Sequence, residues 1–175
     1  PIKNHELFLR GLKVVSQQTN KKIRAFIIGD GEERAKIELL AKELELPFNN
    51  ADLREKNLLT FTSWIKEIDV SNAGMDIIAL TSKNEGTPVS LIEAQASGRA
   101  IVSTAVGGIG DVVIPNETAF LSASGDVNAF AENLLKLVQD DDLRHRMSQK
   151  GNAHVIERFS YQRLCADMRT LYLSL

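Results

Sequence analysis

Two acidic residues, Glu85 and Glu93, flank a stretch of the sequence that is suited to binding an anion. Thr87 and Pro88, between them, are typical of a helix start, because threonine caps a first turn and proline has no N–H to leave unpaired there. The first backbone amides of the predicted helix belong to Val89, Ser90 and Leu91. Unpaired amides at the positive end of a helix dipole bind phosphate, so the sequence predicts a phosphate site here.

Glu93 falls in the second turn of this predicted helix, on the same face as its first residues. A carboxylate there repels a phosphate unless it accepts hydrogen bonds from a diol, and one carboxylate can accept from both hydroxyls of a ribose. Spacing alone proves nothing, since 23 acidic residues in 175 positions produce such a pair by chance about three times. The context favours a site over solvated surface charges, because Gly86 adjoins Glu85 and the small residues Ala96-Ser97-Gly98 close the helix.

Two further turns are rich in glycine and follow segments that are expected to be strands. Ligands of open α/β sheets bind beyond the carboxyl ends of the strands, where such turns lie. Gly29-Asp30-Gly31 and Val106-Gly107-Gly108-Ile109-Gly110 both allow close backbone approach and positive φ angles. The first turn does not meet the dinucleotide fingerprint, because Arg34 stands where a third small residue is needed, and an ordinary tight turn is the favoured interpretation.

Composition limits the classes of function. Lys plus Arg number 21 and Asp plus Glu 23, so the net charge of -2 excludes the broad positive field of a nucleic-acid-binding protein. The longest stretch without a charged residue, from Ala100 to Gly110, has 11 residues, too few for a membrane-spanning helix. A single cysteine, Cys165, and three dispersed histidines exclude an internal disulfide and a structural zinc, and they are typical of a reducing, cytoplasmic location.

Short β-branched runs alternate with helical patterns along the whole chain, which predicts an α/β fold with a doubly wound, mostly parallel sheet. Five strands are expected, at residues 23–28, 58–61, 76–80, 100–103 and 119–121. Helices are expected around Leu7 to Val15 and Ile37 to Leu44, at 88–97 and 127–139, and after Asp140 with a break at Phe159-Ser160. The segment from Pro47 to Lys56 is left unassigned, and Asp140-Asp141-Asp142 is interpreted as a solvated helix cap.

The residues around the two acids carry a resemblance to a known family. Ser82-x-x-Glu85-Gly86-x-Pro88-x-Ser90-Leu91-Ile92-Glu93-Ala94-x-Ala96-x-Gly98, followed by Ile101-Val102-x-Thr104-x-Val106-Gly107-Gly108-Ile109, resembles the donor-binding half of the group 1 (family 4) retaining glycosyltransferases. The resemblance extends upstream through Phe61-x-Ser63-Trp64 and Ile28-Gly29-Asp30-Gly31 to Pro1-Ile2-Lys3-Asn4. It covers residues 1–159, while the tail is similar only in being helical.

This resemblance implies one half of a GT-B fold, a Rossmann-like domain over residues 1–159 that lacks its first strand. A partner arginine of the family would fall upstream of Pro1, with that strand. Residues 160–175 are expected to form a helix that crosses toward an absent, N-terminal acceptor domain. Its apolar stripe of Leu164, Met168, Leu171 and Tyr172 would then be uncovered and open to pairing between copies, or else would pack on the domain's own core.

The resemblance also implies roles for individual residues. Glu85, with the backbone of Gly86 and Thr87, would contact the hydroxyls of the donor sugar, and Glu93 would hold the ribose. The diphosphate would be held by the ammonium of Lys3 and by the amides of Val89 and Ser90. Lys3 and Glu85 are thus the predicted catalytic residues, and the negative charge that develops on the leaving group is stabilised without a metal or another cofactor.

The nucleobase contact is expected near Ser63 and Trp64. The family usually has glycine where Ser63 stands, so base selectivity differs there from the family pattern. Trp64 could stack on a base, but a large aromatic side chain at a strand end is more often a hydrophobic plug, which is the favoured interpretation.

The function implied is transfer of a sugar from a UDP- or GDP-sugar to an acceptor, with retention of configuration. The acceptor would be bound mainly by the absent domain, peripheral membrane contact of the full enzyme is compatible with this, and the chain alone would be inactive. Two alternatives stay open. One is a nucleotide-sugar epimerase or phosphorylase of the same architecture, and the other is a non-enzymatic α/β module that binds a phosphate or a partner.

Overall fold

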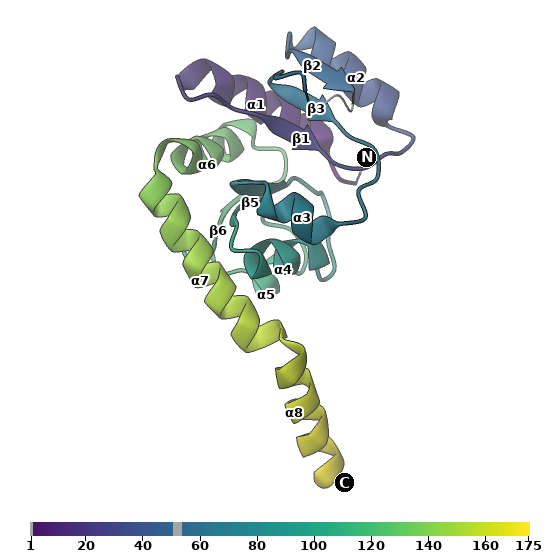
Figure 1. The fold of residues 1–175 in the computed structure, drawn as a ribbon, viewed down its shortest axis with the longest axis vertical. Coiled ribbons are helices and arrows are strands. Elements are labelled where there is room, and N and C mark those ends of the chain that lie inside the picture. Colours follow the sequence, from purple (N-terminus) through teal and green to yellow (C-terminus); the bar gives the residue numbers. More distant parts are fainter. Residues whose placement is uncertain (1, 51–53) are drawn as a thin grey trace.

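The computed structural model describes residues 2–50 and 54–175, and within these ranges short strands alternate with helices (Figure 1). The strands are β1 (Ala25–Ile27), β2 (Phe48–Asn50), β3 (Leu59–Phe61), β4 (Ile77–Leu80), β5 (Ala100–Thr104) and β6 (Ala119–Ser122). The helices are α1 (His5–Gln18), α2 (Arg34–Glu43), α3 (Ile68–Ala73), α4 (Val89–Ala96), α5 (Ile109–Val112), α6 (Val127–Gln139), α7 (Asp141–Phe159) and α8 (Tyr161–Leu173).

The strands form two parallel sheets of three strands each, with the orders β1-β3-β2 and β4-β5-β6. All five predicted strands are present, but the expectation of one five-stranded sheet is corrected, because β1 and β4 do not pair with each other. The sixth strand, β2, lies in the segment left unassigned. It pairs in register with β3, and Phe48 packs edge-on against Phe61, with 5.2 Å between the ring centroids.

The predicted helices are confirmed, including the break between α7 and α8. Asp140 caps α7 by accepting a hydrogen bond from the backbone N–H of Leu143 at 2.8 Å, which confirms the cap interpretation of the acidic run. Ser160 caps α8 in the same way, by accepting from the N–H of Arg163. The sequence did not predict α3 and α5, which have only six and four residues and too short an apolar pattern to recognise.

The core is divided among the two sheets and their helices. Leu7 and Val15 of α1 meet Phe130 and Leu137 of α6 beside β5, and a second group joins the other face of α1 to α2, β1 and β3. A third group joins α4, α5, β5 and β6. The middle strands β3 and β5 are buried along their whole length, whereas every residue of β4 is only partly buried.

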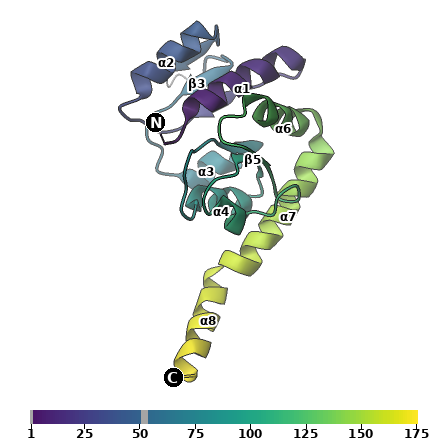
Figure 2. The same ribbon diagram turned by 180° about the vertical axis from the view of Figure 1, so that it is seen from behind.

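The last helix, α8, continues from α7 away from the rest of the molecule (Figures 1 and 2). No residue of α8 is buried. The stripe predicted to be uncovered is exposed, with Leu164 at 61% and Tyr172 at 68%, so the alternative that it packs on the domain's own core is wrong. In the part of the chain that is described, no helix combines the length and the apolar character needed to cross a membrane.

Candidate functional site

Side-chain hydrogen bonds tie the carboxyl ends of β4 and β5 together. Ser103 Oγ donates to the carbonyl of Leu80 at 3.0 Å, and Thr104 Oγ1 donates to the carbonyl of Ser82 at 2.6 Å. Ser82, Ser103 and Thr104 are all completely buried. The loop after β4 therefore leaves the sheet from a fixed point, and it is this loop that carries Glu85.

Glu85 is held in place by two donors on one carboxylate oxygen. Its Oε1 accepts from Lys3 Nζ at 2.7 Å and from Ser82 Oγ at 2.6 Å. The Glu85 side chain is 13% exposed, and that of Lys3 is 58% exposed. Burial raises the pKa of Glu85, but the hydrogen bonds from Lys3 and Ser82 and the charge of Lys3 lower it by more, so the pKa lies below the ordinary glutamate value.

This lowered pKa predicts a pH dependence of stability. A carboxyl group whose pKa is lower in the folded chain stabilises the fold above its unfolded pKa, about 4.3 for glutamate. We expect this contribution to be lost as pH falls below that value, through the lower folded-state pKa. Urea unfolding between pH 3 and 6 should show a steeper loss for the wild-type chain than for Glu85→Gln, and equal slopes would contradict the prediction.

Lys3 reaches Glu85 although 82 residues separate them in sequence, because the N-terminal segment is bound to the loop after β4. The carbonyl of Lys3 accepts from Thr81 Oγ1 at 2.9 Å, and the carbonyl of Ile2 accepts from the backbone N–H of Lys83 at 2.8 Å. The two predicted catalytic residues are thus in direct contact.

The glycine turn after β5 supports the Glu85 loop from the other side. The N–H of Gly108 donates to the carbonyl of Glu85 at 3.1 Å. A Cβ atom on Gly107, whose φ is +52°, would lie 1.9 Å from the Glu85 carbonyl oxygen, and one on Gly108 would lie 2.2 Å from that of Gly86. The close approach predicted for this turn is present, and only glycine allows it.

The start of α4 differs in detail from the prediction. The helix begins at Val89, with Pro88 as the N-cap in an extended conformation, so Thr87 is not the cap and Pro88 is not the first helical residue. The N–H of Leu91 is not free either, because it donates to the carbonyl of Pro88 at 2.9 Å. Among the described residues, no backbone acceptor is found for the N–H groups of Val89 and Ser90, which leaves these two for a ligand.

Three of the predicted residues line one cavity that runs along β1 and β4, from Asp76 at the amino end of β4 to Thr81 at its carboxyl end. Lys3, Ser90 and Glu93 all line a cavity of about 1040 Å³ that also reaches Thr81. Glu93 and Ser90 are both exposed, while Gly86 and Thr87 lie exposed on the loop between Glu85 and α4. A carboxylate, an ammonium group and two helix-start amides are thereby brought together, which is a combination suited to a diol linked to a phosphate.

Ser63 and Trp64 do not line this cavity, because they follow β3, which β1 separates from it. The carbonyl of Ser63 accepts from the N–H of Gly29 at 3.2 Å, so the first glycine turn lies beside them. Trp64 is 77% exposed, and the favoured interpretation of this side chain as a hydrophobic plug is therefore wrong. Its ring is free to contact a ligand.

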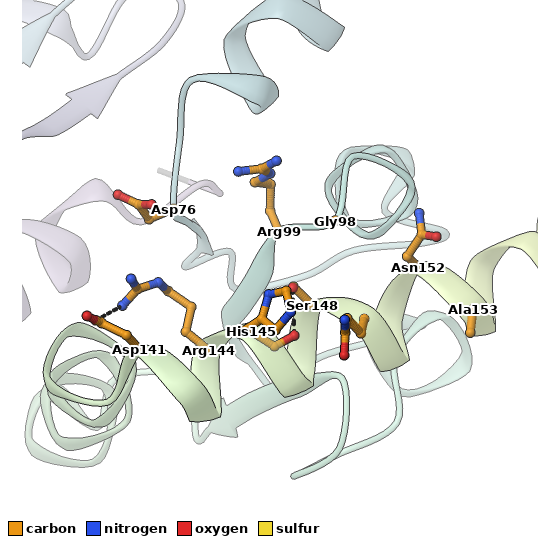
Figure 3. Close-up of a pocket in the computed structure, with 10 residues that line it drawn as sticks. Asp76, Gly98, Arg99, Asp141, Arg144, His145, Ser148, Asn152 and Ala153 are labelled. Atoms are coloured by element: carbon orange, nitrogen blue, oxygen red, sulfur yellow. Dashed lines mark hydrogen bonds and ion pairs between the residues drawn. The ribbon is translucent and has the colours of Figure 1, made fainter.

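A second cavity, of about 730 Å³, lies at the amino ends of β4 and β5, against α7 (Figure 3). Three of its charged side chains have hydrogen-bond partners. Asp141 accepts from Arg144 at 2.9 Å and from Lys21 at 2.6 Å, while Arg99 donates to the carbonyls of Met75 and Ser97. The ion pair between Lys21 and Asp141 joins the start of α7 to the segment after α1, and the Arg99 contacts join the segments that precede β4 and β5.

Two site residues had no role in the sequence-based prediction. Ser82 and Thr104 both stand in the family motif, but only the structure shows that they position the Glu85 loop. A search for metal ligands gives nothing in residues 2–50 and 54–175, where no group of three or more His, Cys, Asp or Glu side chains is found.

Comparison with known proteins agrees with this geometry. The family model described as glycosyl transferases group 1 matches residues 1–154. The N-acetyl-alpha-D-glucosaminyl L-malate synthase of Bacillus anthracis is 26% identical over 149 residues, which cover 85% of this chain and 37% of that protein. The chain spans between 26% and 40% of the length of the first three curated relatives.

Solved structures share the fold. HepE of Anabaena, in complex with UDP, matches with a TM-score of 0.84 at 19% identity, over 100% of this chain and 46% of that one. The C-terminal domain of the glycosyl transferase group 1 family protein LpcC from Francisella tularensis matches with a TM-score of 0.77 at 21% identity, over 91% and 81%. The α/β fold of one GT-B half, expected from the resemblance, is confirmed.

Proposed function

Because the chain belongs to the group 1 glycosyl transferases, we propose that it binds the nucleotide-sugar donor of an enzyme that transfers a sugar to an acceptor. One observation carries this proposal: Lys3, Ser90 and Glu93 line the same cavity, and Lys3 also contacts Glu85. The complex of the structurally similar HepE with UDP supports a nucleoside diphosphate as the ligand.

In the proposed complex the diphosphate rests against the start of α4. The amides of Val89 and Ser90 donate to its oxygens, and Lys3 supplies a full positive charge. Cleavage of the sugar–phosphate bond leaves growing negative charge on the diphosphate, so donors that are already in place stabilise the transition state more than the ground state. A helix end contributes about 0.3–2 kcal/mol, and Lys3 therefore carries the larger share.

The two acids have separate proposed roles. Glu93, one helical turn beyond Val89, accepts hydrogen bonds from the vicinal hydroxyls of the ribose. Glu85, kept ionised by Lys3 and Ser82, accepts from hydroxyls of the sugar, assisted by the backbone of Gly86 and Thr87. We further propose transfer with retention and without a metal, which is what the family resemblance implies.

The nucleobase is proposed to lie toward Ser63 and Trp64. Trp64 is 77% exposed, and stacking of a base on an aromatic side chain contributes about 1–3 kcal/mol. The turn at Gly29 lies beside them, because the N–H of Gly29 donates to the carbonyl of Ser63. Backbone groups of this turn are proposed to form hydrogen bonds with the base.

Removal of one ribose hydroxyl from the nucleotide tests the proposal. Calorimetric titration of the chain should show that UDP binds more tightly than 2′-deoxy-UDP, because Glu93 accepts from both hydroxyls. Glu93→Ala should lower the affinity for UDP about tenfold, which is about 1.4 kcal/mol of binding free energy. The variant should also bind UDP and 2′-deoxy-UDP equally well.

Glu132→Ala removes an exposed acid on α6 and serves as the control, with unchanged titrations expected. A parallel titration with GDP covers the other base. If neither diphosphate binds, or if Glu93→Ala binds both forms like the wild type, the proposed function is wrong.

We also propose that α8 packs on the acceptor domain of the whole enzyme, as the resemblance implies. In the isolated chain the exposed stripe should pair between copies. Light scattering is expected to show dimers that become monomers when Leu164 and Leu171 are replaced by glutamate. Gln162→Glu with Ala166→Glu, on the opposite face of α8, should leave the dimers intact. A wild-type chain that stays monomeric at high concentration would contradict the pairing.

A further inference from the structure

Arg34 stands at the position where a dinucleotide-binding turn has a small residue, and the proposed function gives it no role. In that fingerprint the small residue lets a helix lie close against its strand. Here Arg34 is the first residue of α2, and its side chain extends over the neighbouring strand β3. The guanidinium carbon lies 5.0 Å from the centroid of the Phe61 ring, and Phe61 is completely buried.

Each of the three guanidinium nitrogens of Arg34 has a partner from a different element. Nε donates to Glu38 on α2 at 2.5 Å, Nη1 to the carbonyl of Thr62 after β3 at 2.7 Å, and Nη2 to Oδ1 of Asn50 on β2 at 3.3 Å. The side chains of Arg34 and Glu38 are each 23% exposed. Because the guanidinium is planar and carries its donors in a fixed fork, three partners fix both its position and its orientation.

The bond to Thr62 acts on the turn that carries Ser63 and Trp64. The next carbonyl, that of Ser63, is held as well, because it accepts from the N–H of Gly29 at 3.2 Å and from Thr62 Oγ1 at 2.9 Å. The peptide groups on both sides of the Ser63 Cα atom are therefore fixed. Since a peptide group is planar, two fixed consecutive groups set the backbone dihedral angles between them, and with them the place at which Trp64 begins.

The two anchors of this turn differ in kind, although both come from the segment that joins β1 to α2. The Gly29 bond continues the pairing of β1 with β3, in which the N–H of Thr62 donates to the carbonyl of Ile27 at 2.9 Å. The Arg34 bond comes from a side chain on α2. A single substitution can therefore remove the second anchor and leave the strand pairing in place.

Trp64 depends on the turn for its position because its own side chain is little packed. The residue is 77% exposed. An exposed ring on a mobile backbone loses conformational freedom when a base stacks on it, whereas a ring whose backbone is already fixed loses less. A group that fixes the turn therefore raises the affinity for a base without contacting the base.

We propose that Arg34 is a positioning residue for the nucleobase, which holds the Thr62 carbonyl and thereby presents Trp64 for stacking. This inference rests on the proposed function, which places the base at Ser63 and Trp64. Arg34 itself has no contact with the nucleotide in this arrangement, because its three nitrogens are bonded within the chain.

Fluorescence of Trp64, the only tryptophan in the sequence, tests the positioning before any nucleotide is added. Arg34→Met keeps an unbranched apolar chain near Phe61 and removes the three hydrogen bonds. We expect this variant to show a larger subnanosecond component in the anisotropy decay of Trp64, which measures local motion of the ring and its backbone. An unchanged decay would overturn the inference.

Arg99→Met is the matched control for a general loss of stability. Arg99 also donates to two backbone carbonyls, those of Met75 and Ser97, both at 2.8 Å, but it lies at the amino ends of β4 and β5. Its loss should leave the anisotropy decay of Trp64 as in the wild type. If Arg99→Met changes the decay as much as Arg34→Met does, the effect is not specific to the turn and the inference is wrong.

Calorimetry then connects the turn to the base, with whichever diphosphate the wild-type chain binds, UDP or GDP. Arg34→Met should lower the affinity about tenfold, because a less ordered Trp64 loses part of its stacking contribution. In a chain that already carries Trp64→Ala, the same substitution should have no further effect, since the group through which it acts is absent. A tenfold loss in both backgrounds would overturn the inference.

Two further outcomes keep this inference separate from the proposed function. A wild-type chain that binds neither diphosphate overturns both, whereas binding that Arg34→Met leaves unchanged overturns the role of Arg34 alone. If circular dichroism shows that Arg34→Met is unfolded, Arg34→Lys repeats the measurements. One ammonium group cannot replace a planar fork that bonds three separate acceptors, so the same changes are expected.

Discussion

Gly107→Ala is expected to lower the free energy of unfolding by about 3 kcal/mol. The left-handed conformation at φ +52° costs an alanine about 1–2 kcal/mol, and a Cβ atom 1.9 Å from the Glu85 carbonyl oxygen forces a shift that costs about 1–3 kcal/mol. Urea denaturation measures the change. Because the displaced backbone carries Glu85, the same variant should also weaken UDP binding, which calorimetry measures.

Three other glycines separate the two causes. Gly108→Ala adds only the collision, with the Gly86 carbonyl at 2.2 Å, and should cost about 2 kcal/mol. Gly98→Ala adds only the left-handed conformation, at φ +65° with no atom within 4 Å, and should cost about 1 kcal/mol.

Gly110→Ala adds neither effect, because its Cβ would meet nothing within 4 Å, and should range from neutral to about 1 kcal/mol stabilising. If Gly107→Ala destabilises the chain no more than Gly110→Ala, the contact between the glycine turn and the Glu85 loop does not exist in solution.

Lys3→Met should weaken UDP binding about 30-fold, which is about 2 kcal/mol. The loss comes from the ammonium group that contacts Glu85 and lines the cavity close to the start of α4. The remaining affinity should depend less on salt, since fewer charges are screened. In the Lys3→Met chain without bound nucleotide, the pKa of Glu85 should rise toward its ordinary value, because the hydrogen bond and ion pair with Lys3 are lost.

A matched control is Lys150→Met, which breaks another exposed ion pair. Lys150 lies 3.0 Å from Glu117, and both side chains are more than half exposed. This variant should bind UDP like the wild type. Equal affinities for all three chains would remove Lys3 from the proposed diphosphate site.

Local sequence pattern predicts most of the elements but not their association. The β-branched runs that become β1 and β3–β6 are recognisable because each is apolar and short. Phe48-Asn49-Asn50 is not recognisable, since asparagine is poor in strands, and β2 exists because it pairs with β3 and its phenylalanine packs on Phe61. Nothing local indicates that the strands divide into two sheets.

The site is predictable where a motif carries it. The stretch from Glu85 to Glu93 and the glycine turn at Gly107 are readable as a ligand site and a close approach. The residues that these two segments contact are determined by the tertiary structure and cannot be predicted from local sequence. No spacing rule joins Lys3 to Glu85 across 82 residues, and none identifies the carbonyls that Gly107 and Gly108 approach. The exposure of Trp64 is likewise a property of the tertiary structure, because it depends on whether other segments of the chain pack against this side chain.

The hydrogen bonds at the far end of α4 have a mechanical consequence. Asn152 of α7 donates to the carbonyls of Gln95 at 3.3 Å and Ala96 at 2.8 Å, the last two residues of α4. Eight helical residues span about 12 Å, so α4 is a stiff rod clamped at one end and offering free amides at the other. The orientation of the amide-bearing end of α4 is therefore set in part from its other end, through the position of Asn152 on α7.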